Sequence, residues 1–425
     1  MSVDTRTPVG RTGVWIVNQY ANAPDRPTGT RHFDLGRQLV ARGHGVVIFA
    51  AGFSNITHRE ERLAGFRLYR SEWFGGIRFV WLRTLPYRGN TWQRPINMLT
   101  YVGAFLVVQS RLPAPETVIG STVHPFAALG AWLVARLRGA RFVFEIRDLW
   151  PQTLVDLQAL RSGSPGERLL RAIEAFLVRR ASTVITVLPG MRDYLREQGL
   201  PTVNVVYVPN GVDLSGGEPA VIDGGGLPEP VENVLKAIRR KRAEGRFVLG
   251  YVGALGRVNR LDIIVEAARL AEVRAPGRIG LLIVGDGPER ASLEQQAGRG
   301  GPTVIAPAVP KTHVPAVLSA LDATVVHATS TPVYRYGVSF NKLFDYMAAE
   351  RPVLFACDSA YDPVAAEGAG ISVRPDDPDG IADAILRLAD ATPQQRAAMG
   401  TAGRAYVVRE HNVERLGAIL ASVVE

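Results

Sequence analysis

The feature that most constrains the fold of this 425-residue chain is an alternation of short apolar runs with helical patterns, which occurs in two series. The first series begins with the run Gly13–Tyr20, a loop, a helical pattern over Arg31–Arg42 and a second run at Val46–Ala51. The second series begins at Phe247–Val252. Alternating strands and helices at this spacing predict parallel sheets covered by helices on both faces. We therefore expect an α/β protein with two Rossmann-like, doubly wound domains.

A segment dense in glycine and proline, Ser215–Glu232, separates the two series and is typical of a loop near a domain boundary. We predict a first domain over residues 1–207, completed by a C-terminal helix over about residues 408–425, and a second domain over residues 208–407. The segment Gly403–Glu425 has the pattern of an amphipathic helix with a break near His411–Asn412. Because ligands of doubly wound sheets bind outside the carboxyl ends of the strands, we expect the active site in a cleft between the domains.

Composition narrows the class of protein further. Hydrophobic residues make up 47% of the chain and charged residues 21%, which excludes a disordered polypeptide. A single cysteine, Cys357, excludes an intramolecular disulfide framework and suits a reducing compartment. The first residues have no apolar core of a secretory signal, and no apolar stretch reaches the ~20 residues of a membrane crossing. We expect a cytoplasmic enzyme.

The net charge of +9 is unevenly distributed. Residues 1–210 contain 26 arginines, no lysine and 14 acidic residues, a net of +12, whereas residues 211–425 have a net of −3. A basic half suits a polyanionic partner such as nucleic acid, anionic lipid or a phosphorylated substrate, but a coding preference for arginine explains it equally. The chain lacks interleaved aromatic and basic residues and any recognition module, so we expect no nucleic-acid partner.

Four segments lie where a strand is expected to end and a helix to begin: Pro27–Arg31, Val252–Arg260, Val284–Pro288 and Ser339–Asp345. Most combine glycine or small polar residues with a cation, and the unpaired amides of a helix start favour an anion. None has the pattern of a phosphate loop or of a dinucleotide fingerprint. For each segment alone, a helix cap or tight turn is the better explanation.

The run Tyr336–Pro352, YGVSFNKLFDYMAAERP, resembles the donor-binding segment of family 4 of the retaining GT-B glycosyltransferases. It is most similar to the bacterial surface-polysaccharide branch, of O-antigen or capsule type, which has a G-x-S-x-N-K-L-F-[DE]-Y-M-A motif. The segments NQY, PTGTR, EIRDLWPQTL, VPNGVD, YVGALG and VGDGP are similar to segments of that family in the same order. The resemblance extends over about residues 13–425.

This resemblance implies a GT-B fold and a retaining, metal-independent transfer of a hexose or N-acetylamino sugar from a nucleoside diphosphate, expected to be UDP. The implied acceptor is a saccharide or a polyprenyl-diphosphate-linked saccharide of a cell-surface polysaccharide. We expect no cofactor and no metal, because the sequence has no paired-acid motif and no compact His/Cys cluster. Two alternatives stay open: a nucleotide-sugar-binding homologue without transferase activity, and a nucleotide-sugar epimerase on a similar fold.

Lys342 is the strongest candidate for a catalytic and phosphate-binding cation, because it lies near a helix start in a chain that otherwise prefers arginine. The resemblance implies that Asp345, one helical turn after Asn341, accepts hydrogen bonds from ribose hydroxyls. It also implies that Ser339, Asn341, Gly253 and Gly29 contribute to donor binding.

The chain departs from the family pattern at two places. Gly337 stands where relatives often have a glutamate, which puts the identity of the donor sugar in doubt. Ala254 and Asn259 stand where many relatives have arginine and lysine. Arg257 and Arg260 are candidate replacements for these phosphate cations, although a solvated turn explains them equally.

In the first domain, Arg147 and Asp148 follow an expected strand, and Arg147 stands where many relatives have histidine. We predict that Asp148 orients the acceptor hydroxyl and that Arg147 holds an anionic group, while a buried Arg–Asp pair at the strand end is the rival interpretation. His124 and Arg94 are candidate acceptor contacts, and His124 before a proline is as often a helix cap. Glu145 is expected to point away from Asp148.

Two apolar segments are candidates for contact with a membrane. Trp92–Val108 has aromatic and arginine residues beside an apolar stretch, and Glu167–Arg180 has an apolar face that fits a protein core equally well. Together with the basic first half, Trp92–Val108 predicts a peripheral association with an anionic bilayer, on the inner face of the plasma membrane. Such an association suits a lipid-linked acceptor.

Overall fold

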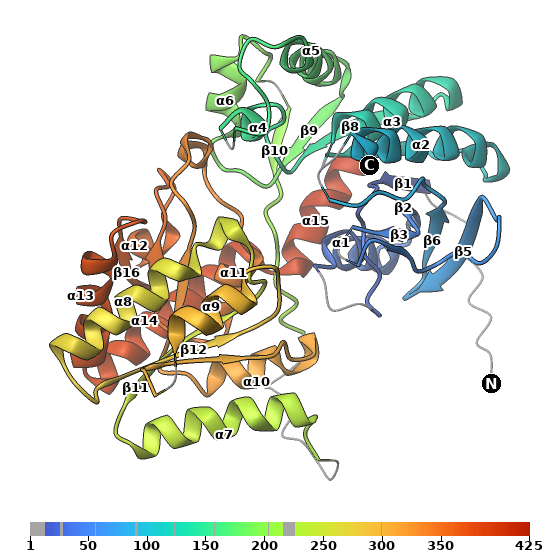
Figure 1. Cartoon of the computed structure of the whole chain (residues 1–425). Helices are drawn as coiled ribbons and strands as arrows, with labels where there is room; N and C mark the ends of the chain where they lie inside the picture. Colours follow the sequence, from blue (N-terminus) through green and yellow to red (C-terminus); the bar gives the residue numbers. More distant parts are fainter. Residues whose placement is uncertain are drawn as a thin grey trace. The chain divides into compact units, whose positions relative to one another are not determined.

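The structure is a computed structural model and describes residues 13–25, 29–55, 57–89, 92–122, 124–156, 158–202, 204–215, 226–298 and 300–425. The chain divides into two compact units (Figure 1), unit 1 with Met1–Asn210 and Val413–Glu425, and unit 2 with Gly211–Asn412. The boundaries expected from the sequence were 207/208 and 407/408. Pro27 and Thr28 of the first candidate loop, and residues 216–225 of the glycine-rich segment, lie outside the described residues.

Unit 1 is built on an eight-stranded sheet with the order β10-β9-β8-β7-β1-β2-β6-β5. Neighbouring strands are parallel except for β5 and β6, an antiparallel hairpin at one edge that the alternating pattern does not predict. The strands are β1 (Gly13–Val17), β2 (Gly45–Ala51), β5 (Tyr69–Phe74), β6 (Ile77–Leu82), β7 (Thr117–Ser121), β8 (Arg141–Ile146), β9 (Thr183–Thr186) and β10 (Val205–Tyr207), and a separate pair is formed by β3 (Phe53–Ser54) and β4 (Arg59–Glu60).

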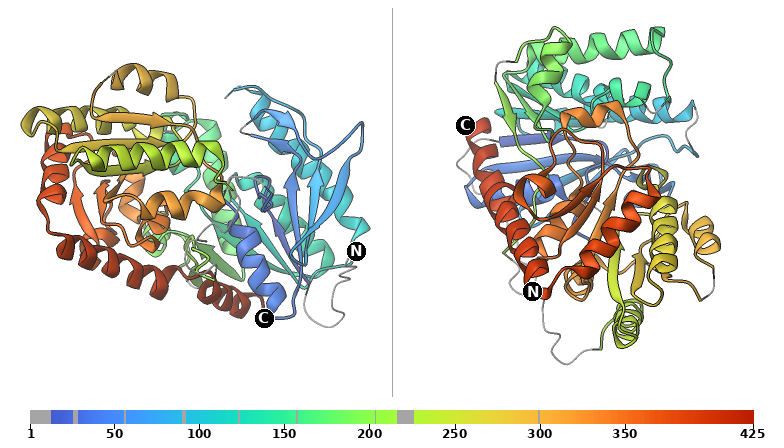
Figure 2. Two further views of the ribbon diagram at one scale, coloured as in Figure 1. Left: turned by 90° about the horizontal axis from the view of Figure 1, so that it is seen from below. Right: turned by 90° about the vertical axis from the view of Figure 1, so that its left-hand side faces the viewer.

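Helices cover both faces of this sheet, because successive residues of a buried strand point to opposite sides. On one face Ile16 packs with α1 and α15, and a Cβ at Gly417 would lie 2.2 Å from Gln38, so this glycine permits the close approach of α15 to α1 (Figures 1 and 2). On the other face the ring of Trp15 contacts that of Phe49, which contacts the ring of Phe105 in α2. The helices are α1 (Arg31–Ala41), α2 (Gln93–Val108), α3 (Pro125–Arg138), α4 (Gln152–Asp156), α5 (Pro165–Arg180), α6 (Met191–Glu197) and α15 (Val413–Val424), with a 3-10 turn η1 (Gln109–Arg111).

Unit 2 is built on a six-stranded, entirely parallel sheet with the order β13-β12-β11-β14-β15-β16. All six residues of β11 and of β12 are buried, as expected for parallel strands covered on both faces. The strands are β11 (Phe247–Val252), β12 (Ile279–Val284), β13 (Thr303–Ala306), β14 (Ala323–His327), β15 (Val353–Ala356) and β16 (Gly370–Val373).

Two apolar cores lie on the two faces of this sheet. Alternate residues of β11 separate them: Val248 packs with α7, α10 and α11, and Leu249 packs with α8, α9 and α13. The helices are α7 (Glu229–Ala243), α8 (Leu261–Arg274), α9 (Arg290–Ala297), α10 (Val314–Ser319), α11 (Asn341–Ala348), α12 (Pro363–Glu367), α13 (Pro378–Asp390) and α14 (Pro393–Tyr406), with 3-10 turns η2 (Arg257–Asn259), η3 (Lys311–His313) and η4 (Pro332–Tyr336) and a π-helical turn η5 (Val407–His411).

One detail differs from the sequence prediction, and another confirms it. Helix α7 begins at Glu229, directly after Pro228, so the glycine- and proline-rich segment ends earlier than Glu232. The C-terminal amphipathic segment is interrupted where it was expected to break, with η5 ending at His411, Asn412 in an extended conformation and α15 beginning one residue later.

Candidate functional site

The candidate residues lie at the edge of each sheet where a doubly wound fold binds ligands. The strand order reverses between β11 and β14 in unit 2 and between β1 and β7 in unit 1. Ligands bind outside the carboxyl ends of the strands at such a reversal. The segments after β11 and β14 lead to Gly253–Arg260 and to Lys342, and those after β1 and β7 lead to Gly29 and His124.

Lys342 lies in the first turn of α11 and is held by two neutral acceptors. Its Nζ donates to the Tyr251 hydroxyl at 2.9 Å and to Asn259 Oδ1 at 2.5 Å, and lies 4.8 Å from the centroid of the Tyr251 ring. The Tyr251 hydroxyl donates at 2.7 Å, and Asn259 Nδ2 at 3.0 Å, to the carbonyl of Ala254. One backbone carbonyl therefore orients both groups that accept from the lysine.

The charge of Lys342 has no counterion among the described residues, since its only hydrogen-bond partners there are the hydroxyl and the amide oxygen. Burial lowers the pKa of Lys342 to about 8. Even a partly buried cation such as Lys342 loses hydration, and without an anion this loss is poorly compensated. This arrangement favours the binding of an anion beside Nζ.

The loops after β11 and β12 are locked together by backbone contacts that explain their glycines. The Gly253 amide donates to the Val284 carbonyl at 2.9 Å, and the Leu255 amide donates to the Asp286 carbonyl at 2.9 Å. A Cβ at Gly285 would lie 1.9 Å from the Gly253 carbonyl oxygen, so only glycine allows this approach. The VGDGP glycine therefore has a structural role: it positions the loop that carries Asn259.

Helix α11 begins without a side-chain cap. The side chain of its N-cap residue, Phe340, has no acceptor for the first amides of the helix, and such amides favour an anion. Asn341 is exposed, whereas Ser339 and Asp345 are partly buried. Gly337 has a φ of +103°, a conformation that favours glycine over the glutamate of many relatives.

Two aromatic contacts fix α11 in place. The hydroxyl of Tyr346 donates to the Val252 carbonyl and accepts from the Val252 amide, both at 2.8 Å. The ring of Phe344 stacks on His411 with centroids 3.6 Å apart. The motif around Lys342 thus supplies the residues that anchor the helix as well as the candidate cation.

The two arginines proposed as phosphate cations are paired with acids of unit 2. The side chain of Arg257 is 89% exposed and its Nε lies 3.2 Å from Glu289 Oε1. Arg260 Nη2 lies 2.9 Å from Asp262 Oδ2, and its Nη1 lies 3.6 Å from Asp376 Oδ1. Their roles in phosphate binding stay predictions.

His327, which was not among the predicted site residues, holds the Asn259 backbone in place by a hydrogen bond to its carbonyl. It is the buried last residue of β14; its Nδ1 is 3.0 Å from the Asn259 carbonyl and its Nε2 is 3.4 Å from the Asp376 amide. Burial lowers the pKa of His327, so the ring is neutral, with Nδ1 as donor and Nε2 as acceptor. A polar residue at the carboxyl end of a buried strand was the signal that could have identified it.

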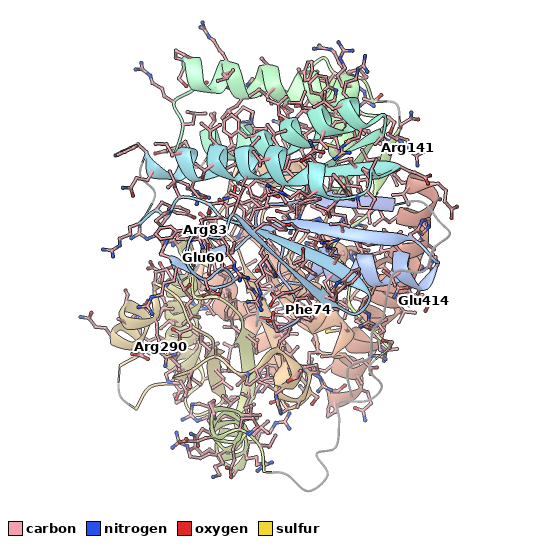
Figure 3. The ribbon with its side chains drawn as sticks, turned by 90° about the vertical axis from the view of Figure 1, so that its right-hand side faces the viewer. Glu60, Phe74, Arg83, Arg141, Arg290 and Glu414 are labelled. Atoms are coloured by element: carbon pink, nitrogen blue, oxygen red, sulfur yellow. The ribbon has the colours of Figure 1, made fainter. Side chains whose placement is uncertain are left out.

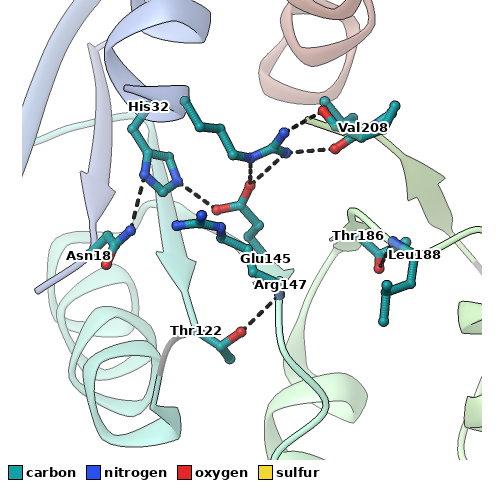
Figure 4. A network of polar contacts seen from close by, with 10 residues as sticks. Asn18, His32, Thr122, Glu145, Arg147, Thr186, Leu188 and Val208 are labelled. Carbon is teal, nitrogen blue, oxygen red and sulfur yellow. Dashed lines mark hydrogen bonds and ion pairs between the residues drawn. The ribbon is translucent and has the colours of Figure 1, made fainter. Parts of the chain in front are cut away.

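Unit 1 contains a buried charged network centred on Glu145 of β8 (Figure 4). Arg31 Nη2 lies 2.9 Å from Glu145 Oε1, and His32 Nε2 lies 2.6 Å from Oε2. Arg31 also donates to the carbonyls of Val208 at 2.6 Å and Pro209 at 2.5 Å, so it ties the start of α1 to the segment after β10. Glu145, for which the sequence predicted only a direction away from Asp148, thus joins α1 and the segment after β10 at the carboxyl edge of this sheet.

The protonation states in this network follow from its contacts. Burial alone would raise the pKa of Glu145, but His32 and Arg31 outweigh it and hold this pKa well below its usual value. Burial lowers the pKa of His32, only partly offset by Glu145. Asn18 Nδ2 lies 3.1 Å from His32 Nδ1, so the neutral ring accepts from Asn18 and donates to Glu145.

The predicted residues Arg147 and Asp148 follow β8 but do not form an ion pair with one another in the described part of the chain. The Arg147 amide donates to Thr122 Oγ1 at 2.9 Å, and its guanidinium contributes to the lowered pKa of Glu145 (Figure 4). Asp148 is exposed. Gly29 is also exposed, and its carbonyl accepts from Asn22 Nδ2 at 3.3 Å.

His124 is completely buried and caps α3. Its Nδ1 accepts from the Ala127 amide at 3.3 Å, and its Nε2 donates to Gln19 Oε1 at 2.7 Å. Burial first, and then the charge of Arg94, lower the pKa of His124 to about 3. Both ring nitrogens are used within unit 1, so this structure supports the capping interpretation. Arg94 is partly buried in the first turn of α2.

No group of three or more His, Cys, Asp or Glu side chains suited to a metal ion occurs in the described part of the chain. Independence from metal stays a prediction, which the absence of such a group does not test.

Sequence profiles of two glycosyltransferase domains match the chain. The "Glycosyl transferase 4-like domain" matches residues 28–211, and "Glycosyl transferases group 1" matches residues 246–391. The chain belongs to the glycosyltransferases with these two domains. The two matches correspond to unit 1 and unit 2.

Curated relatives of the chain are glycosyltransferases of different pathways. The colanic acid biosynthesis glycosyl transferase WcaI of Escherichia coli is 27% identical over 62% of this chain and 63% of its own length. The 2-deoxystreptamine glucosyltransferase of Streptomyces kanamyceticus is 30% identical over 44% of this chain and 50% of its own length. The chain thus spans between half and two thirds of the length of these two relatives.

The fold is similar to that of solved structures, among them WaaG, a glycosyltransferase involved in lipopolysaccharide biosynthesis, which is 16% identical, covers 97% of this chain and 99% of its own, and superposes with a TM-score of 0.63. The structure of HepE from Anabaena in complex with UDP and glucose is 14% identical, covers 97% of this chain and 99% of its own, and superposes with a TM-score of 0.65. The GT-B fold that the motif resemblance implied is confirmed.

Proposed function

We propose that this glycosyltransferase transfers a hexose or N-acetylamino sugar from UDP, with retention of configuration, to a saccharide or polyprenyl-diphosphate-linked acceptor of cell-surface polysaccharide synthesis. The observation that carries the proposal is the partly buried ammonium of Lys342, which donates only to neutral acceptors among the described residues, beside an uncapped helix start. A diphosphate supplies the anion that this cation lacks. The WcaI relative supports a polysaccharide product, and the HepE complex supports UDP.

In this proposal unit 2 binds the donor. The diphosphate contacts Lys342 and the first amides of α11, which stabilise the charge that develops on the leaving oxygen without a metal ion. Asp345 accepts hydrogen bonds from the ribose. Ser339, Asn341 and Gly253 border the donor, and Arg257 and Arg260 add positive charge around the phosphates.

Unit 1 binds the acceptor in this proposal. Asp148, exposed after β8, orients the acceptor hydroxyl, and the donor phosphate accepts its proton. Arg147 and Arg94 hold anionic groups such as an acceptor diphosphate, and Gly29 allows close approach of substrate at the same sheet edge. The enzyme associates with the membrane that carries a lipid-linked acceptor.

A thermal-shift screen across nucleoside diphosphates and their sugars tests the donor assignment. Ligand at about 100 times its dissociation constant adds roughly 2.7 kcal/mol to the free energy of unfolding. We expect a shift with UDP that Asp345→Ala abolishes, whereas Asp390→Ala, an exposed acid on α13, leaves it unchanged. Equal shifts in both variants would remove the ribose contact.

A transfer assay separates the proposal from its alternatives. With a UDP-sugar and a polyprenyl-diphosphate saccharide, we expect UDP release in the presence of EDTA and a product whose anomeric configuration, read by NMR, matches that of the donor. UDP binding without donor consumption would indicate a non-catalytic homologue. Exchange of solvent deuterium into the UDP-sugar without acceptor would indicate an epimerase.

A further inference from the structure

The outward faces of α2 and α3 form one apolar surface on unit 1, here called the α2–α3 surface. Its exposed residues are Ile96, Leu99 and Val107 of α2 and Leu133 and Leu137 of α3. Leu99 is 55% exposed and Leu137 is 67% exposed. The two helices lie side by side in both Figure 1 and Figure 3, with α5 beyond α3.

This surface lacks the charges that a solvent-facing helix normally carries. No charged residue occurs between Pro95 and Ser110, or between Pro125 and Ala135. Between the helices a cavity of about 300 Å³ is lined only by apolar residues, among them Leu106, Leu129 and Trp132. Contiguous exposed apolar surface of this kind marks an interaction site.

The part of the chain that contains α2 and α3 is rich in arginine. Residues 73–144 contain eight arginines and a single acidic residue, Glu116. Helix α5 continues the surface through a ring contact of Trp132 with Phe176, with centroids 4.6 Å apart. Three exposed arginines, Arg136 of α3 and Arg168 and Arg179 of α5, form no ion pair among the described residues.

We propose that the α2–α3 surface docks on an anionic bilayer, with its leucines at the acyl boundary and its arginines on the headgroups. An apolar face bordered by arginine suits an interfacial site, and no helix in the described part of the chain is long and apolar enough to cross a membrane. A second copy of the chain is disfavoured as the occupant, because it would bring the same positive charge to the interface.

The α2–α3 surface lies close to the edge of unit 1 that receives a lipid-linked acceptor in the proposed function. Helices α2 and α3 begin at the carboxyl edge of the sheet of unit 1, the edge that carries Gly29 and Asp148. Trp92, directly before α2, is 73% exposed, and tryptophan favours the membrane interface. A docked bilayer therefore lies beside the edge that receives the acceptor. Only this link to the acceptor rests on the proposed function; the docking surface itself does not.

Co-sedimentation with vesicles, in the absence of nucleotide, tests the apolar part of the proposal. We expect binding to phosphatidylcholine vesicles that contain phosphatidylglycerol, and about a tenfold or greater loss of affinity in each of Leu99→Asp and Leu133→Asp. Val273→Asp, at a residue of α8 that is 68% exposed, is the matched control and should bind like the original protein. Equal binding of all three variants would overturn the assignment.

The charged part is tested by neutralising Arg136, Arg168 and Arg179 with glutamine. Each substitution should weaken binding about fivefold, and the triple variant about a hundredfold, because each arginine contributes near an anionic surface. Arg239→Gln on α7 is the control. Brominated lipid should quench the fluorescence of Trp92, and Trp92→Phe should lose that quenching. Binding that ignores anionic lipid and salt would contradict the proposal.

Two further measurements keep the outcomes distinct. Urea unfolding followed by tryptophan fluorescence shows whether each variant still folds, since all six tryptophans lie in unit 1. Analytical ultracentrifugation that reveals a dimer lost in Leu99→Asp would replace the bilayer by a second copy of the chain. Intact UDP binding without vesicle binding would overturn this inference and leave the proposed transferase in place.

Discussion

Unit 1 buries the positively charged side chain of Arg31 and unit 2 partly buries that of Lys342, but the two units compensate the charge differently. In unit 1 the guanidinium of Arg31 is 2.9 Å from Glu145 and donates to two backbone carbonyls. In unit 2 the ammonium of Lys342 donates hydrogen bonds, among the described residues, only to the hydroxyl of Tyr251 and the amide oxygen of Asn259. The first cation has its anion within the chain, whereas the second has none among the described residues.

This difference separates a structural charge from a binding charge. A buried ion pair that is also hydrogen-bonded holds its surroundings in one arrangement, and removal of one partner leaves the other charge uncompensated. A partly buried cation with neutral partners, such as Lys342, keeps an unsatisfied preference for an anion, which a ligand can satisfy. Arg31 therefore holds the carboxyl edge of its sheet together, and Lys342 is available for the donor diphosphate in the proposed function.

The largest expected effect comes from removing the anion of unit 1. Glu145→Gln leaves Arg31 buried without its carboxylate, so we expect the free energy of unfolding of unit 1 to fall by about 3–5 kcal/mol. Urea unfolding followed by tryptophan fluorescence measures this, because unit 2 has no tryptophan. The exposed Glu116→Gln is the matched control and should change stability little. Similar curves for the two variants would show that Glu145 is not a structural anion.

The next largest effect is an increase in the stability of unit 2, caused by removal of the Lys342 charge. The pKa of Lys342 falls from 10.5 to about 8, so in the folded protein its charged form is disfavoured by about 3 kcal/mol. Below pH 8 the charge destabilises the fold, and the penalty is relieved as the pH rises from about 8 to 10.5. Lys342→Met should therefore stabilise unit 2 at pH 7, with a gain that disappears above pH 10.5, as measured by hydrogen exchange of β11 and β12 amides.

The same substitution should weaken UDP binding by about ten- to a hundredfold, the loss of a charge-assisted hydrogen bond. In the original protein, UDP affinity should fall about eightfold between pH 7.5 and 9 as Lys342 loses its proton. Titration calorimetry measures both, and Lys236→Met, an exposed lysine of α7, is the control. A less stable Lys342→Met protein, or one that binds UDP normally, would refute the assignment of Lys342 as a binding charge.

The alternating pattern predicts the part of the fold that follows from local periodicity. The parallel strands β11, β12 and β14 lie where their apolar runs predict them, because strands buried on both faces are continuously apolar. In the β5–β6 hairpin the edge strand β5 interrupts its aromatic residues with polar ones and gives no such run. The start of α7 was not predicted, because the glycines and prolines before it are typical of a loop.

In the candidate site, too, some features follow from a local sequence pattern and others depend on contacts between distant segments. Lys342 is identifiable from a local motif, and the structure places it beside Tyr251 and Asn259, which are far from it in the sequence. The roles of His327 and Glu145 depend on contacts across a sheet, and single-sequence reasoning has no access to such pairings. His124 fits both of its interpretations in the sequence, and only its burial and its bond to Gln19 distinguish them.

The smallest expected effect on UDP affinity comes from Arg257. Like Lys342, it is a candidate phosphate cation in a segment after a strand of unit 2, but its environment is different. Its side chain is 89% exposed and already lies 3.2 Å from Glu289, so solvent and salt screen it from a bound phosphate. Arg257→Gln should lower UDP affinity less than about fivefold, since exposed charge pairs contribute about 0–1 kcal/mol, and the loss should vanish at high salt. Because Glu289 lies beside Arg257, Glu289→Gln should strengthen UDP binding slightly under the same conditions. A salt-resistant loss in Arg257→Gln as large as that of Lys342→Met would mean that Arg257 leaves Glu289 to contact the diphosphate directly, and that burial does not decide which cation binds it.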